Sequence, residues 1–308
     1  MTKTAFLFAG QGAQKVGMAA DLYEAYPIVK ETFSTASRIL GYDLRELINH
    51  DEEKLNQTRY TQPAILTTSV AIYRVLQEKG FAADMVAGLS LGEYSALVAA
   101  GALSFEEAVD LVAKRGQFME TAAPAGTGKM VAVMNTEPSV IEEICQKASV
   151  KGIVSPANYN TPGQIVIGGE TAAVDYAVEL FKAAGVKRLI PLKVSGPFHT
   201  ALLKSASEQL AAELEKVTVK PLQIPLVGNT EAKVMETENI KALLARQVME
   251  PVRFYDSVAT MKNAGVEAFV EVGPGKVLSG FVKKIDKNVS VAHVEDLESL
   301  QALVNEKS

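Results

Sequence analysis

The chain has 308 residues, of which 48% are hydrophobic, and its formal net charge is −5 at pH 7. This length and apolar content allow a large buried core, arranged as one large domain or as two unequal ones. The acidic balance argues against a general nucleic-acid-binding protein, and the single cysteine, Cys145, excludes an intrachain disulfide framework and favours the reducing cytoplasm.

From the N-terminus, short apolar runs alternate with amphipathic segments, which is typical of an α/β fold with a largely parallel sheet. The first run is too short for a signal peptide. The longest apolar stretch, near 95–103, falls short of the roughly 20 residues of a bilayer span, so we expect no membrane association. The elements predicted in this part are a strand at 5–9, a helix at 62–79, a strand at 85–89, a helix at 91–100, and a helix begun by the capping box of Ser104 and Glu107.

The pattern changes after a linker-like segment at 124–128. It predicts, in order, a strand at 130–134, a helix at 138–147, strands at 153–158 and 164–167, a helix at 172–184 and a strand at 188–194. The order βαββαβ within about seventy residues is typical of a ferredoxin-like unit. We therefore predict a small ferredoxin-like domain at 126–195, inserted into a large α/β domain made of 1–125 and 196–308.

The α/β alternation then resumes in the last third of the chain. The predicted elements there are helices at 201–216, 240–249, 255–264 and 276–284, and strands at 224–228 and 268–272.

A G-x-S-x-G nucleophile-elbow pattern occurs at Gly88-Leu89-Ser90-Leu91-Gly92, between a predicted strand and a predicted helix. Glycines two residues on either side let the backbone turn sharply, so that the Ser90 hydroxyl projects above the sheet. The N–H groups that open the following helix then lie near an oxyanion formed on an attacked carbonyl. The pentapeptide also occurs in ordinary loops, but the strand before it and the helix after it favour a catalytic serine.

A catalytic serine needs a base, and the chain has three histidines. His50 lies in a polar turn, where a solvated loop residue is expected. His293 lies near the C-terminus in an apolar run, as an edge-strand residue would. His199 lies in a loop that leads into a helix, and catalytic groups collect in such loops. Position therefore mildly favours His199.

An acid to orient His199 is missing from the sequence pattern. An ordinary α/β-hydrolase runs serine, acid, histidine, with the histidine late in the chain, whereas more than a hundred residues follow His199 here. A backbone carbonyl at a helix C-terminus can orient an imidazole instead, because the last carbonyls of a helix lack intrahelical partners. The end of the helix at 240–249, around Gln247, is a candidate.

Nearly the whole chain resembles the malonyl-CoA:acyl carrier protein transacylases, which load malonyl groups for fatty-acid synthesis. Their fold is a hydrolase-like core with a ferredoxin-like insert, in agreement with the pattern above. The matching segments, in the order of the family, are Phe8-Ala9-Gly10-Gln11-Gly12-Ala13-Gln14, Thr61-Gln62-Pro63-Ala64, Gly88-Leu89-Ser90-Leu91-Gly92-Glu93-Tyr94, Arg115-Gly116, Asn160-Thr161-Pro162-Gly163-Gln164, Gly196-Pro197-Phe198-His199, Pro251-Val252-Arg253-Phe254 and Glu271-Val272-Gly273-Pro274-Gly275.

The resemblance implies a role for each residue of a catalytic set. Ser90 would be acylated by malonyl-CoA, His199 would be its general base, and the main-chain carbonyl of Gln247 would orient His199. The backbone N–H groups of Gln11 and Leu91 would form the oxyanion hole.

It also implies substrate-binding residues, namely Arg115, Phe198 and Asn160. Arg115 would hold the free carboxylate of malonate, since a guanidinium matches a carboxylate with two parallel hydrogen bonds. Without the resemblance, a helix-surface arginine paired with Glu107 or Asp110 would be the simpler interpretation. Phe198 precedes the base, where phenylalanine goes with malonyl and serine with methylmalonyl in related domains, because a bulky ring crowds an α-methyl group.

The predicted function is a two-step transfer of malonyl from malonyl-CoA to the phosphopantetheine thiol of acyl carrier protein. We expect a monomer without metal or bound cofactor, serving fatty-acid synthesis. Leu89 departs from the family, many of whose members carry histidine there, and this change would alter packing or substrate preference. The alternatives are an esterase or thioesterase, an acyltransferase of a polyketide pathway, and a non-catalytic acyl-CoA or carrier-protein binding module.

Carrier proteins are typically acidic, so an acidic enzyme needs a local basic surface beside its cleft. The simpler interpretation of any such lysines and arginines is that they are scattered, solvated surface charges. The candidates for such a surface are Lys187, Arg188, Lys276, Lys283 and Lys284.

Overall fold

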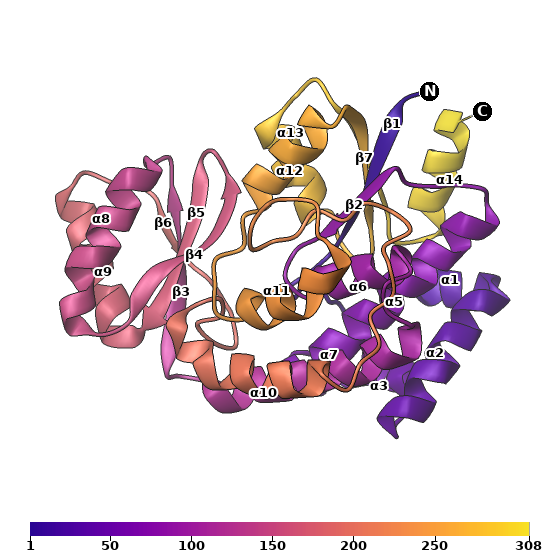
Figure 1. Cartoon of the computed structure of the whole chain (residues 1–308), viewed down its shortest axis with the longest axis horizontal. Coiled ribbons are helices and arrows are strands. Elements are labelled where there is room, and N and C mark those ends of the chain that lie inside the picture. Colours follow the sequence, from indigo (N-terminus) through magenta and orange to yellow (C-terminus); the bar gives the residue numbers. More distant parts are fainter. Residues whose placement is uncertain (308) are drawn as a thin grey trace.

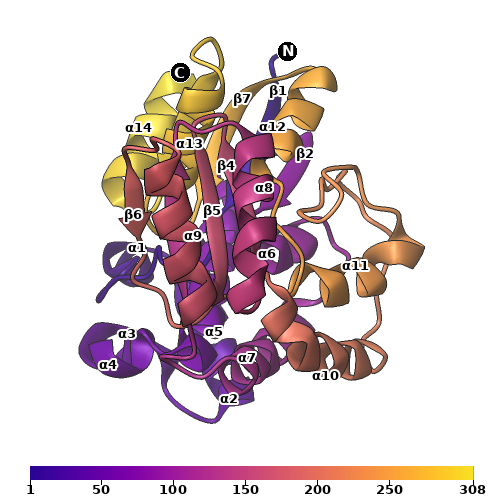
Figure 2. The same ribbon diagram turned by 90° about the vertical axis from the view of Figure 1, so that its left-hand side faces the viewer.

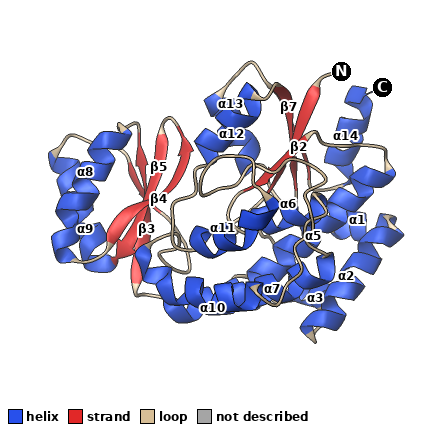
Figure 3. Cartoon of the chain, in the orientation of Figure 1, coloured by secondary structure: helices blue, strands red, loops and turns tan. Residues whose placement is uncertain are grey.

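A computed structural model describes residues 1–307 as an α/β protein with two separate four-stranded sheets (Figures 1 and 3). The larger sheet is parallel, in the order β2-β1-β7-β8. Its strands are β1 (Lys3–Phe8), β2 (Met85–Gly88), β7 (Val266–Val272) and β8 (Ser290–Val294). The start of β1 and the last described helix, α14 (Leu297–Lys307), lie at the same end of this sheet (Figure 1).

The parallel sheet is buried on both faces, as its almost uninterrupted apolar strands require. Alternate residues of β1 point to opposite sides: Phe6 and Phe8 join one core cluster, while Ala5 and Leu7 join another. The second face is covered by α12 (Phe254–Asn263) and α13 (Val277–Ile285). The first is covered by the remaining helices of the large part, which are α1 (Ala20–Ala25), α2 (Pro27–Leu40), α3 (Leu44–His50), α4 (Glu52–Leu55), α5 (Thr58–Glu78), α6 (Gly92–Ala99), α7 (Phe105–Ala122), α10 (Lys204–Leu214), α11 (Ile240–Gln247) and α14 (Leu297–Lys307).

The smaller sheet is antiparallel, in the order β4-β5-β3-β6. It consists of β3 (Gly128–Met134), β4 (Val154–Thr161), β5 (Gln164–Glu170) and β6 (Leu189–Pro191), with α8 (Pro138–Ala148) and α9 (Thr171–Ala183). Both helices pack on its outer face, toward the viewer in Figure 2. The inner face, with Met130 and Val166, is turned toward the large part and lines a cavity between the two.

Local sequence signals explain several element ends. Pro27 occupies the first turn of α2, and Gly41 ends that helix in the left-handed conformation, with φ at 80°. At α7 the serine cap of the predicted capping box is present, with the Ser104 hydroxyl accepting from the Glu107 N–H at 3.1 Å. The same hydroxyl donates to the Glu107 carboxylate at 3.1 Å, in place of the backbone bond that would complete the box. Three short 3-10 turns complete the described elements: η1 (Ser149–Lys151), η2 (Ala201–Leu203) and η3 (Thr237–Asn239).

The prediction of a strand at 224–228 is wrong. This segment makes two isolated bridges, a parallel one from Leu226 to Val86 of β2 and an antiparallel one from Val227 to Val234. It does not extend the ladder of β2, because Pro225 has no N–H to donate. His50 is not in a turn but ends α3, with an exposed side chain, whereas His293 lies in the edge strand β8 as expected. Among residues 1–307, no helix combines the length and the apolar character needed to cross a membrane.

Candidate active site

Ser90 occupies the sharp turn between β2 and α6, with φ at 54°. The turn is possible because its neighbours are glycines: a Cβ on Gly88 would overlap the main chain of Gly92, and a Cβ on Gly92 would overlap the Phe8 carbonyl. A left-handed conformation in a non-glycine residue is strained, and such strain collects at functional sites. The turn points the Ser90 side chain into the cavity between the two sheets.

His199 meets Ser90 although 109 residues separate them: Ser90 Oγ lies 2.8 Å from His199 Nε2. On the other side of the ring, His199 Nδ1 lies 2.7 Å from the main-chain oxygen of Gln247. A carbonyl can only accept, so Nδ1 carries a proton and the Nε2 lone pair of the neutral ring accepts the Ser90 hydroxyl proton. A carbonyl at the end of α11 therefore stands where an acid would be expected.

Burial and the nearby Arg115 guanidinium lower the pKa of His199 to about 4. The ring is 4% exposed, so its charged form loses most of its hydration. At neutral pH the imidazole is therefore uncharged and can accept a proton.

Arg115 is not the helix-surface residue that the simpler interpretation expects. Its side chain is 1% exposed, and one of its terminal nitrogens donates to Gln62 Oε1 at 2.8 Å. The other donates to Gln247 Oε1 at 3.1 Å and lies 3.3 Å from Ser90 Oγ. The neighbouring Lys114 forms the surface ion pair with Asp110 instead. A permanent positive charge thus stands beside the serine hydroxyl.

A polar network around Asn229 and Glu93, which no sequence motif indicates, stabilises the Ser90 turn. Asn229 accepts from the Ser90 N–H at 2.8 Å and donates to the Gly88 carbonyl at 2.5 Å, so one amide bridges both sides of the turn. Glu93 accepts from the Asn229 N–H at 3.0 Å and from the Gln247 side-chain amide. Glu93 lies in the matching segment that contains Ser90, and Gln62 lies in the matching segment 61–64. The sequence of neither segment indicates the hydrogen bonds that these two side chains make.

The two backbone N–H groups expected to form an oxyanion hole belong to Gln11 and Leu91. Within residues 1–307 neither N–H donates a hydrogen bond, and Leu91 directly precedes the first residue of α6. Unpaired donors at a helix start suit a developing negative charge. The Gln11 side chain is held by Thr58, at 3.0 Å.

The cavity that holds Ser90 has a volume of about 690 Å³. Phe198 lies in its wall next to the histidine, and Leu89 lines it beside the serine. Asn160, from β4, donates to Gln164 at 2.9 Å, while its own Oδ1 is buried without a partner. The lining thus combines apolar surface with a few polar groups, as ligand sites do.

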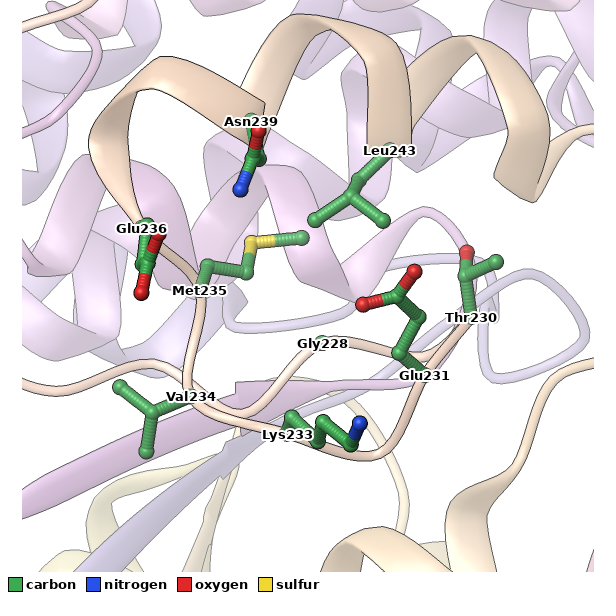
Figure 4. A pocket seen from close by; sticks show the side chains of 9 residues that line it. All are labelled: Gly228, Thr230, Glu231, Lys233, Val234, Met235, Glu236, Asn239 and Leu243. Carbon is green, nitrogen blue, oxygen red and sulfur yellow. The ribbon is translucent and has the colours of Figure 1, made fainter.

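A second cavity, of about 170 Å³, lies between the 228–236 segment and the start of α11 (Figure 4). Gly228 and Thr230 line it, whereas Asn229 between them bonds to Ser90. Among the described residues, no group of three or more His, Cys, Asp or Glu side chains is placed to hold a metal ion.

A serine and a neutral histidine at the carboxyl end of a parallel strand define a class of α/β enzymes that move acyl groups through a serine. Within that class, the chain belongs to the acyl transferase domain family, whose model matches residues 5–302.

Its relatives agree on the reaction class. The chain is 48% identical to the malonyl CoA-acyl carrier protein transacylase of Escherichia coli K12, over 98% of this chain and 99% of that one. The crystal structure of MCAT from Streptococcus pneumoniae is 69% identical, with a TM-score of 0.97, covering 99% and 100%. A malonyl-transacylase solved in complex with a type II PKS acyl-carrier protein is 45% identical, with a TM-score of 0.96, covering 99% and 100%. The protein is an acyltransferase.

Proposed function

We propose that this acyltransferase moves malonyl from malonyl-CoA to the phosphopantetheine thiol of acyl carrier protein, for fatty-acid synthesis. The observation that carries the proposal is the buried Arg115 guanidinium, 3.3 Å from Ser90 Oγ. A thioester bound at Ser90 with a carboxylate on its acyl group would pair with this charge, whereas a simple acyl chain would leave the charge unpaired at a cost of several kcal/mol. The relatives named above carry the same activity in their names.

In the first step, Ser90 Oγ attacks the thioester carbonyl while His199 Nε2 takes the hydroxyl proton. The N–H groups of Gln11 and Leu91 stabilise the oxyanion, and the Gln247 carbonyl stabilises the imidazolium through Nδ1. The C–S bond then breaks, His199 returns the proton to the departing CoA thiolate, and malonyl remains as an ester on Ser90.

In the second step, the carrier thiol enters the same cavity and gives its proton to His199. Its sulfur attacks the malonyl ester, the C–O bond to Ser90 breaks, and the proton returns to the serine oxygen. Both donor and acceptor carry phosphopantetheine, so one channel serves both steps. The unpaired Asn160 Oδ1 in that channel suits an amide N–H of the arm, and Phe198 limits bulk beside the acyl group. This chemistry calls on no metal or bound cofactor.

We also propose that the chain forms two domains, a hydrolase-like core and a ferredoxin-like insert. The element order β3-α8-β4-β5-α9-β6 with sheet order β4-β5-β3-β6 supports a ferredoxin-like domain at 126–195. The strand–serine–helix turn supports a hydrolase-like core made of 1–125 and 196–308. The single buried cysteine, Cys145, is compatible with a cytoplasmic enzyme.

Intact-protein mass spectrometry tests the function directly. The protein is incubated with malonyl-CoA, the adduct is located by peptide mapping, and acyl carrier protein is then added. A malonyl ester on Ser90 that moves to the carrier thiol supports the proposal. Release of free malonate without transfer indicates a thioesterase instead, and binding of malonyl-CoA without any covalent adduct indicates a non-catalytic module.

The acylation rate should depend on pH through His199. The base must be neutral, and its pKa is lowered to about 4, so protonation inactivates it only at low pH. We expect acylation to persist to about pH 5 and to fall steeply near pH 4, about tenfold per pH unit. Rapid-quench measurement of the malonyl adduct after short pH jumps gives the profile, with enzyme returned to neutral pH as the control. A steep loss centred at the ordinary value of 6.5 would contradict the burial argument.

Carrier-protein docking is proposed at the basic residues around α13 and β6. Lys276 directly precedes α13, whose Val277 and Phe281 line the cavity, and Lys284 lies in the last turn of this helix. We expect charge reversal at Lys276 and Lys284 to raise the KM for carrier protein about tenfold without slowing acylation by malonyl-CoA. The control is Lys182→Glu, in the last turn of α9 on the outer face of the small sheet. Equal transfer kinetics for the double variant and the control would refute this surface.

A further inference from the structure

Glu93 is a buried carboxylate to which the two-step mechanism assigns no role. It lies in the first turn of α6, and its side chain is 0% exposed. Burial of an ionisable group is costly, and it raises the pKa of Glu93 to about 7. The titratable groups that face it are Arg115, whose positive charge lowers this pKa, and Tyr94, which is uncharged at neutral pH because its own pKa is raised to about 12. An apolar side chain would fill the same space more cheaply.

Both oxygens of Glu93 hold residues that touch the reacting groups. One oxygen accepts from the Asn229 N–H at 3.0 Å, and the Asn229 side chain fixes the Ser90 turn. The other oxygen accepts from Gln247 Nε2. The Gln247 amide nitrogen also lies 3.0 Å from the Ser90 carbonyl and 3.1 Å from Asn229 Oδ1. An amide nitrogen has two hydrogens for these three acceptors, and the ionised carboxylate is the strongest of them.

Gln247 contacts both the catalytic base His199 and the guanidinium of Arg115. Its main-chain oxygen orients His199, and its side-chain oxygen accepts from Arg115 at 3.1 Å. A rotation of the Gln247 amide would therefore displace the acyl-carboxylate clamp, and a shift of its backbone would displace the base. The Glu93 carboxylate opposes both movements because it fixes the orientation of that amide.

We propose that Glu93 is a positioning residue that sets, through Gln247 and Asn229, where His199 and Arg115 stand relative to Ser90. The inference rests on the proposed function, because it gives Arg115 the role of holding the malonyl carboxylate. It predicts that one side chain without substrate contact controls both the rate of acylation and the preference for a carboxylated donor.

The test is Glu93→Gln, which keeps the shape but removes the charge and leaves one oxygen for two N–H donors. Single-turnover acylation is measured with malonyl-CoA and with acetyl-CoA, which needs the base but not the clamp. We expect acylation by malonyl-CoA to fall about 10²-fold and acylation by acetyl-CoA about tenfold, so that the donor preference also falls about tenfold. Glu93→Asp, which keeps the charge, should restore part of the preference.

The controls separate positioning from mere folding. Glu106→Gln removes an exposed carboxylate from the first turn of α7 and should change neither donor. A Glu93→Gln enzyme that melts at a lower temperature but acylates per active site at the wild-type rate and preference would overturn the proposal. A wild-type enzyme that forms no malonyl-serine would contradict the proposed function instead.

A second variant, at Gly228, would displace the Glu93 carboxylate without changing Glu93 itself. It therefore tests the proposal even if Glu93→Gln does not fold. A Cβ on Gly228 would lie 3.2 Å from Glu93 Oε1 and 2.9 Å from Met235 Cε, the side chain that lies over Gly228 in the small cavity of Figure 4. Gly228→Ala should therefore lower the donor preference in the same direction, about threefold. The matched control is Gly280→Ala, where a Cβ meets no atom within 4 Å. Equal preference in the two alanine variants would overturn the proposal.

Discussion

Ser90→Ala is expected to abolish the malonyl adduct and to lower transfer to acyl carrier protein by about 10⁵-fold, the scale at which loss of a nucleophile acts in serine enzymes. The reason is that no other hydroxyl stands 2.8 Å from a neutral imidazole among the described contacts. Alanine keeps the Cβ that the left-handed turn already accommodates at φ 54°, so the fold should be retained. Intact mass after malonyl-CoA and steady-state transfer together measure the effect.

Ser95→Ala is the matched control for this change. Ser95 lies in α6, the helix that follows the Ser90 turn; it is fully buried, and its hydroxyl has no hydrogen-bond partner among the described residues. Its removal should leave the adduct and the transfer rate within about twofold of the wild type, since it breaks no contact. A malonyl adduct that persists in Ser90→Ala would place the nucleophile elsewhere and remove the basis of the mechanism.

The alternation of apolar runs was sufficient to predict most of the fold, because strands buried on both faces leave a strong local signal. It was not sufficient where pairing is partial or the helices are short. Residues 224–228 have an apolar composition, yet a proline limits them to one bridge beside β2. The short helices α1, α3 and α4 have too few turns to show a clear period, and the pattern does not predict them. The longer helices α2 and α14 are absent from the predicted elements as well.

The site divides in the same way. Ser90 follows from a local pattern, and the choice of His199 is narrow because the chain has three histidines. Asn229 and Glu93 are different: the contacts that join Asn229 to Ser90 and to Glu93 span more than 130 residues of sequence, and nothing in their immediate sequence neighbours indicates them. Polar groups that satisfy one another inside a core are set by tertiary packing, so a single sequence contains no periodic signal for them.

Arg115 provides the largest expected change in specificity. Arg115→Ala should lower acylation by malonyl-CoA about 10³-fold, roughly 4 kcal/mol, because the malonyl carboxylate would be buried without its partner. Arg115→Lys should lose about 10²-fold, since an ammonium keeps the charge but cannot form the two parallel bonds. Acylation by acetyl-CoA should change far less in both variants. Single-turnover kinetics with the two donors measures the ratio.

The pH profile of Arg115→Ala gives an independent check on the same residue. The guanidinium helps to keep the pKa of His199 low, so its removal should raise that pKa from about 4 toward 6.5 and move the steep acid limb upward. Lys114→Ala is the control: this neighbouring cation pairs with Asp110 and Glu213 at the surface, where ion pairs contribute little. If Arg115→Ala left both the donor ratio and the acid limb unchanged, Arg115 would be neither the carboxylate clamp nor a neighbour that acts on the base. A second outcome is possible, in which the preference for malonyl-CoA over acetyl-CoA is lost but the acid side of the pH profile does not move. It would show that Arg115 acts on the acyl group alone, and that burial by itself keeps the His199 imidazole neutral.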